Sequence, residues 1–279
     1  MEIRTIKTFD HYRLLYRYWD VPSPRGVVIC LHGVQSHSEW FARSCQYLAD
    51  RGYRVYAPDR RGSGMNNAQR GDCPWYQAFL FDVRLFVDIE QKMSPRMPVH
   101  LMGVSWGGKL AAMTAIQYPA GIRSVILIAP GLAEKVDLPF REKLRVAAAR
   151  LIAPTRLFRI PIDPKMFTAN PERIAYIGGD RCMLKMATAR FLVESRRMSG
   201  YVRHNAGKLE TPVMMMLAGI DDIVDNDRLI ELFKRFGAWK KGFKIYADAY
   251  HTIEFERDNE KFFNDIAEWC DQFPAPERW

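Results

Sequence analysis

One five-residue pattern, Gly103-Val104-Ser105-Trp106-Gly107, constrains the fold more than any other stretch of the chain. Residues 99–102 before it form a short apolar run, as in a buried strand, and residues 108–116 after it are good helix formers. The pattern therefore predicts a strand, a sharp turn and a helix in direct succession. The two glycines leave room for the returning helix, and the turn holds the serine oxygen clear of the sheet. Such a pattern can also be a simple turn, so it predicts chemistry only together with partner residues.

Strands and helices alternate along most of the chain. An antiparallel hairpin is expected over residues 3–19, and apolar strands are expected at 27–31, 53–57, 99–102, 125–129, 213–219 and 243–246. Helices are expected at 38–50, after Pro74, at 108–116, at 226–236 and from about 258 to 270. This alternation predicts an α/β protein with a mostly parallel central sheet flanked by helices.

The alternation breaks between residues 131 and 210. This segment carries helical patterns and turns marked by Pro154, Pro161 and Pro164, with no convincing strand. We interpret it as a helical cap inserted after the sixth strand, with a core formed by residues 1–130 and 211–279. The cap holds 16 of the 41 Lys and Arg residues but only 8 of the 32 Asp and Glu residues. The rest of the chain holds 25 basic and 24 acidic residues. Nearly all of the positive excess is therefore expected on the cap.

The composition excludes several classes of protein. No apolar run reaches about 18 residues, so no membrane-spanning helix is expected, and charges near the N-terminus argue against a secretory signal. Five scattered cysteines without a C-x-x-C pair favour free thiols in a reducing compartment, so we expect a cytoplasmic protein without a metal site. The basic residues follow no recognisable nucleic-acid-binding motif, so nucleic acid is not an expected partner. We also expect no cofactor.

A serine hydroxyl becomes a nucleophile when a base takes its proton and an acidic group orients that base. Of the six histidines, His251 is the preferred base because it follows an expected strand in a short loop, at the edge where ligands collect in open α/β sheets. It also follows Ser105 in the chain, as this architecture requires. His100 is expected within a strand, where a role in core packing is the simpler interpretation.

The acid is expected in the loop after the strand at 213–219. Asp221, Asp222 and Asp225 occur there, between Ser105 and His251 in the chain. Asp225 is expected to cap the next helix. The residues alone leave open which of the other two carboxylates orients the histidine.

Five motifs together resemble the α/β-hydrolase superfamily, and within it the monoacylglycerol lipases and lysophospholipase-like serine hydrolases. They are Leu31-His32-Gly33-Val34 and the segments 59–64, 103–108, 219–224 and 249–251. Two positions depart from the family pattern. Gln35 stands where relatives often have another glycine, and Arg60-Arg61 stand where many have Gly-His, so both could reshape the acyl pocket or its entrance.

The resemblance implies roles for individual residues. The family places its triad acid three residues after the glycine that corresponds to Gly219, so the implied triad is Ser105, Asp222 and His251. The implied oxyanion hole is formed by the backbone amides of Val34 and Trp106.

The cap contains an apolar stripe at helical spacing, flanked by basic residues. We interpret this stripe mainly as a face that packs on the body, and contact with an anionic membrane is the alternative. A second run from Cys182 to Val193 is expected to be core, or to line an acyl tunnel. The stripe consists of Phe140, Leu144, Ala147, Ala148, Leu151 and Ile152.

The predicted function is hydrolysis of carboxylic esters by a serine hydrolase, with a monoacylglycerol or lysophospholipid type of small lipid ester as substrate. Two alternatives remain open. The same triad could serve a peptidase or an acyltransferase, since the fold does not fix the acyl acceptor. The chain could also be a non-catalytic protein that binds acyl ligands.

Overall fold

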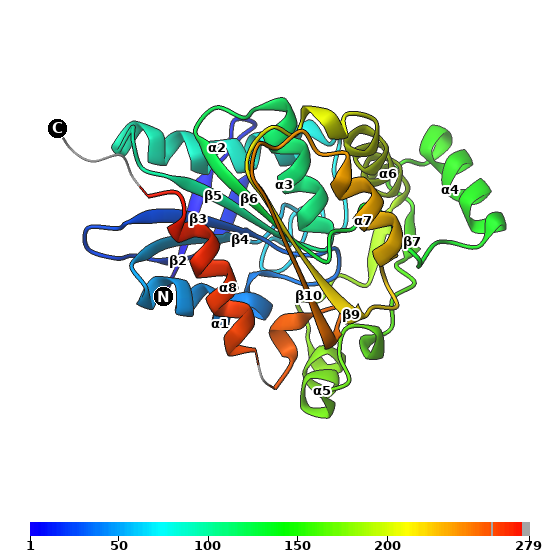
Figure 1. Cartoon of the computed structure of the whole chain (residues 1–279). Coiled ribbons are helices and arrows are strands. Elements are labelled where there is room, and N and C mark those ends of the chain that lie inside the picture. Colours follow the sequence, from blue (N-terminus) through cyan, green and yellow to red (C-terminus); the bar gives the residue numbers. More distant parts are fainter. Residues whose placement is uncertain (258, 275–279) are drawn as a thin grey trace.

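A computed structural model describes residues 1–257 and 259–274 of the chain. Eight strands form one sheet in the order β1-β2-β4-β3-β5-β6-β9-β10, which Figure 1 shows running through the centre of the molecule. The strands are β1 (Glu2–Lys7), β2 (Arg13–Trp19), β3 (Gly26–Leu31), β4 (Tyr53–Pro58), β5 (Val99–Val104), β6 (Ile122–Ile128), β9 (Val213–Ile220) and β10 (Lys241–Tyr250).

The sheet is mostly parallel. Only the pairs β1·β2 and β2·β4 are antiparallel, whereas the pairs from β4 through β3, β5, β6 and β9 to β10 are all parallel. The central strands β3 and β5 are buried along their whole length, because helices cover both faces of the sheet. The expected hairpin, sheet and fold class are confirmed.

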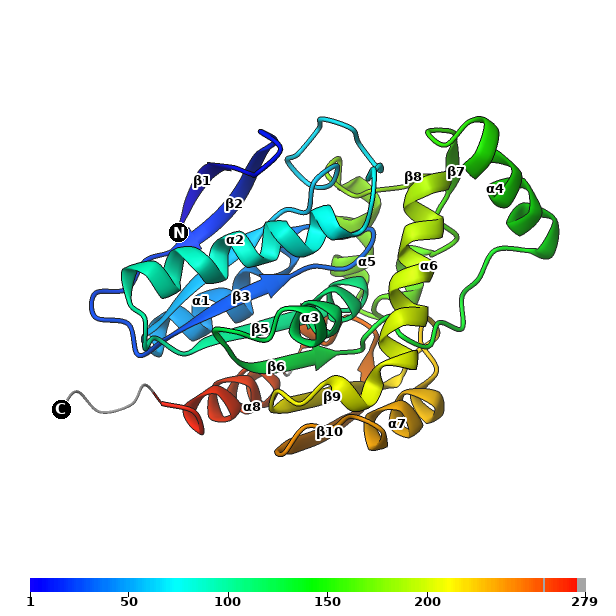
Figure 2. The same ribbon diagram turned by 90° about the horizontal axis from the view of Figure 1, so that it is seen from above.

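Five helices cover the sheet in two groups. Helices α2 (Gln77–Met93), α3 (Trp106–Gln117) and α7 (Asn226–Lys234) lie on one face, and α1 (Ala42–Asp50) and α8 (Glu260–Asp271) lie on the other (Figures 1 and 2). The short 3-10 helix η1 (Ser38–Phe41) precedes α1, and η4 (Ile253–Phe255) lies between β10 and α8. Residue 258, where the last helix was expected to begin, lies outside the described residues.

The segment between β6 and β9 projects over the carboxyl ends of the parallel strands (Figure 2). It contains α4 (Phe140–Ile152), β7 (Leu157–Arg159), η2 (Pro164–Met166), α5 (Pro171–Gly179), β8 (Met186–Thr188), α6 (Ala189–His204) and η3 (Ala206–Lys208). The expectation that this segment holds no strand is wrong, since β7 and β8 pair in an antiparallel ribbon. The run from Cys182 is helical only from Ala189 onward.

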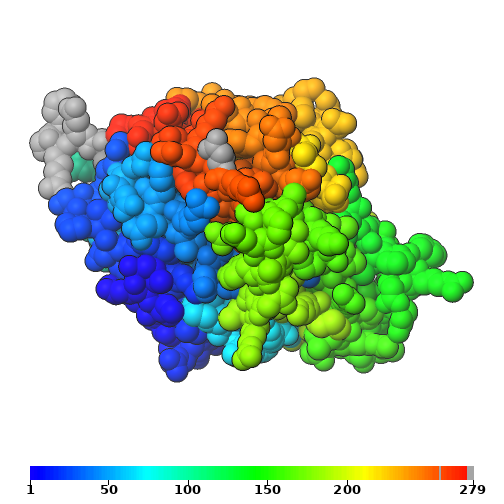
Figure 3. Space-filling view, turned by 90° about the horizontal axis from the view of Figure 1, so that it is seen from below, coloured from blue at the N-terminus to red at the C-terminus, as the bar shows by residue number. Residues whose placement is uncertain are grey.

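Most of the cap shares the core of the body. Phe167, Ile177 and Phe191 belong to the same continuous cluster of buried side chains as the sheet. Helix α4 differs, because it buries only Val146 and Ala149. Its predicted packing face is wrong: all six residues of the apolar stripe are exposed, and α4 projects from the edge of the molecule (Figure 3, green).

No helix in the described part of the chain combines the length and the apolar character that crossing a membrane requires. All five cysteines are free thiols, and only Cys182 among them is not buried.

Candidate active site

Ser105 lies in the turn between β5 and α3, as its pattern predicts. Its backbone has φ 53° and ψ −117°, a region that a residue with a side chain adopts only under strain. The two glycines of the pattern permit this turn. A Cβ atom on Gly103 would lie 2.4 Å from the carbonyl oxygen of Gly107, and one on Gly107 would lie 2.0 Å from that of Leu31. The close approach of strand, turn and helix therefore requires glycine at both positions.

The strand order brings the other candidate residues to the same edge of the sheet. β5, β6, β9 and β10 are consecutive neighbours, and Ser105, Asp221 and His251 follow the carboxyl ends of β5, β9 and β10. Adjacent strands lie about 4.8 Å apart. Segments that are far apart in the chain therefore meet at one edge.

The structure corrects the predicted acid from Asp222 to Asp221. The Oδ2 atom of Asp221 lies 2.8 Å from Nδ1 of His251, and both side chains are buried. Its Oδ1 atom accepts hydrogen bonds from the amides of Ile223, at 2.8 Å, and Val224, at 2.9 Å. Asp222 is exposed instead. Consecutive residues at the end of a strand point in opposite directions, and the turn that directs Asp221 inward directs Asp222 to solvent.

Charge and hydrogen bonding keep the Asp221 carboxyl ionised. Burial alone would raise its pKa, but the positive charge of the His251 imidazolium form, the hydrogen bond from the ring and the amides of Val224 and Ile223 lower the pKa below its ordinary value. A carboxylate can only accept hydrogen bonds, so the network assigns the proton on Nδ1 to His251. The lone pair of the imidazole then lies on Nε2.

His251 lies at the end of β10, as predicted, with only 1% of its surface exposed. Its Nε2 atom is buried and has no hydrogen-bond partner within residues 1–257 and 259–274, and thus none to Ser105. Phe167 of the cap packs against the ring at 6.1 Å between centroids, and its carbonyl accepts a hydrogen bond from the Thr252 amide. The histidine thus carries a free basic nitrogen in a site that the cap shields from water.

The two amides predicted for an oxyanion hole come from separate segments beside Ser105. Trp106 is the first residue of α3, so its N–H lies outside the hydrogen-bond ladder of the helix. Val34 follows β3, and the loop containing it packs on the serine, since a Cβ atom on Gly33 would lie 3.3 Å from Cβ of Ser105. Val34, Ser105 and Trp106 line the same cavity.

Arg60 contacts the candidate site, although the sequence marked it only as a departure from the family pattern. Its buried guanidinium donates to the carbonyl oxygens of Gly33 and Val34, both at 3.0 Å. The same group lies 4.5 Å from the ring centre of Trp106. Arg60 therefore holds the backbone of the Val34 loop against the helix that begins after the serine. The signal in the sequence was an arginine two residues after the end of strand β4.

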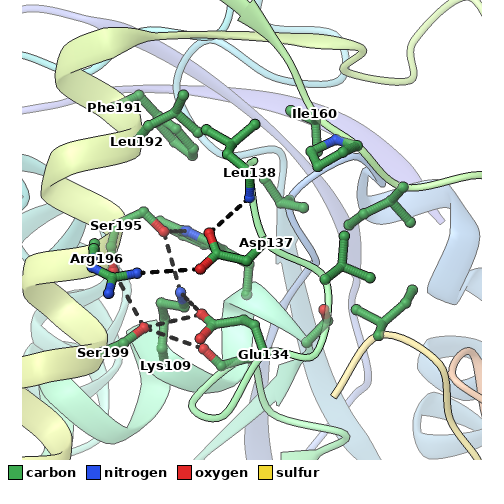
Figure 4. Close-up of a pocket in the computed structure, with 18 of the residues that line it drawn as sticks. Lys109, Glu134, Asp137, Leu138, Ile160, Phe191, Leu192, Ser195, Arg196 and Ser199 are labelled. Carbon is green, nitrogen blue, oxygen red and sulfur yellow. Dashed lines mark hydrogen bonds and ion pairs between the residues drawn. The ribbon is translucent and has the colours of Figure 1, made fainter. Parts of the chain in front are cut away.

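A cavity of about 540 Å³ opens beside Ser105 under the cap. Most of the labelled side chains in Figure 4 come from α6 and from the segment that follows β6. A polar cluster forms part of the wall: the Lys109 ammonium donates to Glu134 Oε1 at 2.8 Å and to Ser195 Oγ at 3.2 Å (Figure 4). Trp106 Nε1 also donates to Ser195 Oγ, at 2.8 Å. The cavity thus combines apolar walls with a hydrogen-bonded polar cluster close to Ser105.

One group of potential metal ligands occurs among the described residues. Ligand atoms of His37, Asp180 and Cys182 lie within 4.8 Å of one another. The Asp180 carboxylate already accepts hydrogen bonds from His37 Nε2, Trp40 Nε1 and the Cys182 amide. These bonds account for the carboxylate and attach the cap to the loop after β3.

Comparison with known proteins finds a matching family model, similar proteins and similar solved structures. A family model described as serine aminopeptidase, S33, matches residues 22–258. The human protein named monoglyceride lipase is 26% identical over 95% of this chain and 89% of its own length. Phospholipase YtpA of Bacillus subtilis is 23% identical over 91% of this chain and 98% of its own length. The structure of a soluble variant of yeast monoglyceride lipase with a substrate analogue, 22% identical, superimposes with a TM-score of 0.86 over 99% of this chain and 96% of that one.

Proposed function

Because the chain belongs to the serine aminopeptidase S33 family of α/β-hydrolases, we propose that it is a serine hydrolase that cleaves carboxylic esters of lipids. The observation that carries the proposal is the 2.8 Å contact between Asp221 and His251, which leaves Nε2 as a free base at the edge of the sheet where Ser105 lies.

The mechanism follows from the proton on Nδ1. Ser105 Oγ attacks the ester carbonyl while His251 Nε2 takes its proton, and Asp221 stabilises the imidazolium that forms. The amides of Val34 and Trp106 donate to the oxyanion, each contributing on the order of 3 kcal/mol. The alcohol then leaves with the proton from His251 as the carbon–oxygen bond breaks. Water repeats the sequence on the acyl-enzyme and releases the acid.

The substrate we propose is a lipid with one acyl chain, such as a monoacylglycerol or a lysophospholipid. The cavity volume of about 540 Å³ fits the range of small-molecule sites. Relatives named monoglyceride lipase and phospholipase support the same substrate class. Free thiols at all five cysteines support our proposal that the protein works in the cytoplasm.

A fluorophosphonate probe tests the nucleophile. We expect it to label the native protein and not Ser105→Ala, with loss of p-nitrophenyl butyrate hydrolysis in the same variant. Ser94→Ala, at the end of α2 and outside the cavity lining, serves as the control and should be labelled normally. Equal labelling of the native protein and Ser105→Ala would refute the proposal. Binding of an acyl ligand without release of alcohol would favour the non-catalytic alternative.

Peptidase activity is the second candidate, because the family model is described as an aminopeptidase. An aminopeptidase needs an unpaired carboxylate for the free ammonium group of its substrate. The two acidic residues of the cavity are already paired: Glu134 with Lys109 at 2.8 Å, and Asp137 with Lys143 at 2.5 Å. We therefore expect esters to be cleaved faster than aminoacyl anilides. The reverse preference would establish the peptidase, and transfer of the acyl group to an added alcohol would establish an acyltransferase.

We also propose that α4 contacts an anionic membrane surface. Phe140, Leu144, Leu151 and Ile152 are 73%, 56%, 84% and 84% exposed, and Arg141 and Arg145 lie between them on the same helix. An apolar face flanked by cations is typical of helices that lie in the interface of a bilayer.

Sedimentation with vesicles tests this membrane contact. We expect binding to phosphatidylglycerol vesicles that exceeds binding to phosphatidylcholine and falls about tenfold or more in Leu151→Ser/Ile152→Ser. Met93→Ser removes a side chain that is 56% exposed on α2 and should bind normally. Unchanged binding of the double variant would refute a role for α4.

A further inference from the structure

The cavity beside Ser105 has an apolar end and a charged end. Phe191, Leu192, Leu138 and Ile160 lie together at one end in Figure 4, and Lys109, Glu134 and Ser199 lie at the other. A ligand that fills this cavity must therefore be amphiphilic, with its polar part directed toward α6 and the segment after β6.

The acidic groups of the cavity are neutralised by its own cations. Glu134 accepts from Lys109 and from Ser199 Oγ, the latter at 3.2 Å. Asp137 pairs with Lys143 at 2.5 Å and lies 3.8 Å from Arg196. These contacts leave no free carboxylate in the lining to bind a cationic ligand.

Two further cations of the lining have no such neutralisation. Within the part of the chain that the structure describes, neither Arg203 nor Arg228 forms an ion pair with an acidic side chain. Arg203 donates through Nη1 to the carbonyl oxygen of Leu132 at 2.9 Å, which fixes the guanidinium without cancelling its charge. The Arg228 side chain is exposed at the start of α7.

These two arginines also connect the cavity with a second hollow. Both line the Ser105 cavity and an adjoining groove of about 520 Å³ between the start of α7 and the end of α6. The charge of Arg203 reaches the interior: burial lowers the pKa of the Lys109 ammonium, Glu134 raises it, and the positive charges of Arg203 and Arg196 lower it. The groove lining carries Arg203, Arg228 and Arg235 against Asp227 and Glu231, and Glu231 pairs with Lys234. The charged end of the cavity therefore opens into a groove whose lining has a positive excess.

We propose that Arg203 and Arg228 bind the phosphate of an anionic lysophospholipid, whose acyl chain lies at the apolar end of the cavity. Guanidinium groups bind phosphate through charge-assisted, often paired hydrogen bonds. This inference rests on the proposed function. The bond that breaks is still the carboxylic ester: its acyl carbon passes to Ser105, and the glycerophosphate leaves as the alcohol with the proton from His251. The phosphate ester itself is untouched.

A pair of substrates with the same short acyl chain tests the head-group preference below micelle formation. We expect kcat/KM for 1-decanoylglycerol 3-phosphate to exceed that for 1-decanoylglycerol by about tenfold or more, as for hydrogen bonds to a charged group. The preference should decrease with added salt, because the groove is open to solvent. The ratio of the two kcat/KM values should fall about tenfold in Arg228→Gln, and Arg228→Lys should restore part of it. Lys261→Gln, which removes an exposed cation of α8 outside the linings of the cavity and the groove, is the control and should keep the native ratio.

These measurements distinguish failure of the phosphate site from failure of the proposed hydrolase activity. Equal kcat/KM for the two lipids, or an unchanged ratio in Arg228→Gln, would overturn the phosphate site while the hydrolase proposal stands. If neither lipid is cleaved, the hydrolase proposal fails. Binding measurements would then test the phosphate site without turnover. We expect Ser105→Ala/Arg228→Gln to bind the phosphate-bearing lipid at least about tenfold more weakly than Ser105→Ala does. Equal affinities of these two variants would overturn the phosphate site.

Discussion

Replacement of Asp221 or its neighbour Asp222 by asparagine distinguishes the observed acid from the one that family spacing implied. In Asp221→Asn the side chain keeps its size, and its oxygen can still accept from the Ile223 and Val224 amides at 2.8 and 2.9 Å. The loop should therefore keep its conformation. What changes is the atom that faces Nδ1 of His251 at 2.8 Å, which becomes an N–H donor.

The magnitude follows from the tautomer of the imidazole. Opposite an amide N–H, Nδ1 must accept, so the proton moves to Nε2, the atom that has to take the proton of Ser105. In serine proteases the corresponding change lowers kcat about 10⁴-fold, equivalent to about 5 kcal/mol of transition-state stabilisation. Asp222 is exposed, so Asp222→Asn should alter kcat by less than about twofold.

The assay is steady-state hydrolysis of p-nitrophenyl butyrate, with thermal unfolding of each variant as the check on folding. We expect Asp221→Asn to lose kcat with little change in KM and melting temperature. A large loss in Asp222→Asn together with an active Asp221→Asn would refute the assignment and the tautomer argument with it.

Three further predictions concern the surroundings of the site. Arg60→Lys should lower kcat up to about 10²-fold in the p-nitrophenyl butyrate assay, because one ammonium cannot hold the carbonyls of both Gly33 and Val34 as the guanidinium does. A native kcat in this variant would contradict the role of Arg60. Burial raises the pKa of Glu254 to about 7, so the native state binds the proton of this carboxyl more tightly than the unfolded state does. The free energy of unfolding should therefore fall by about 3 kcal/mol as pH rises from below 5 to above 7. Urea unfolding should show that Glu254→Gln lacks this decrease, and parallel pH profiles would refute it. Gly107→Ala should destabilise the protein by about 3 kcal/mol or more, because the added Cβ would collide with the carbonyl oxygen of Leu31. The control Gly178→Ala lies in α5, where an added Cβ would meet no atom within 4 Å, and should stabilise the protein by about 0.5 kcal/mol. Similar melting temperatures for the two variants would contradict the close approach at Gly107.

The fold and two site residues could be predicted because their signals are local. A strand, a turn with paired glycines and a helix determine the environment of Ser105, and alternation of strands and helices predicts the parallel sheet that carries His251 to the same edge. The acid could be placed only within a short loop. Asp221 and Asp222 have the same chemistry, and only the backbone turn determines which one faces the histidine.

The errors in the cap have a different origin. Strands of three residues, such as β7 and β8, are too short to show an alternating pattern. The stripe on α4 was detected as helical, yet periodicity identifies an apolar face without identifying what covers it. In this chain Val146 and Ala149 contact α6, and the larger apolar side chains point away from the body.

The contacts of Trp106 show which part of the cap is joined to the catalytic elements. Its indole stacks on Phe191 of α6 at 5.6 Å between centroids and donates to Ser195 of the same helix. The Arg60 guanidinium lies 4.5 Å from the Trp106 ring and 5.3 Å from that of Phe191, while it holds the loop of Val34. The start of α3, the loop of Val34 and α6 thus form one packed unit, and a shift of α6 would displace both amides that we propose bind the oxyanion. Helix α4 lies outside this unit but packs on α6 through Val146 and Ala149, so a displacement of α4 that moved α6 would also reach the geometry at Ser105.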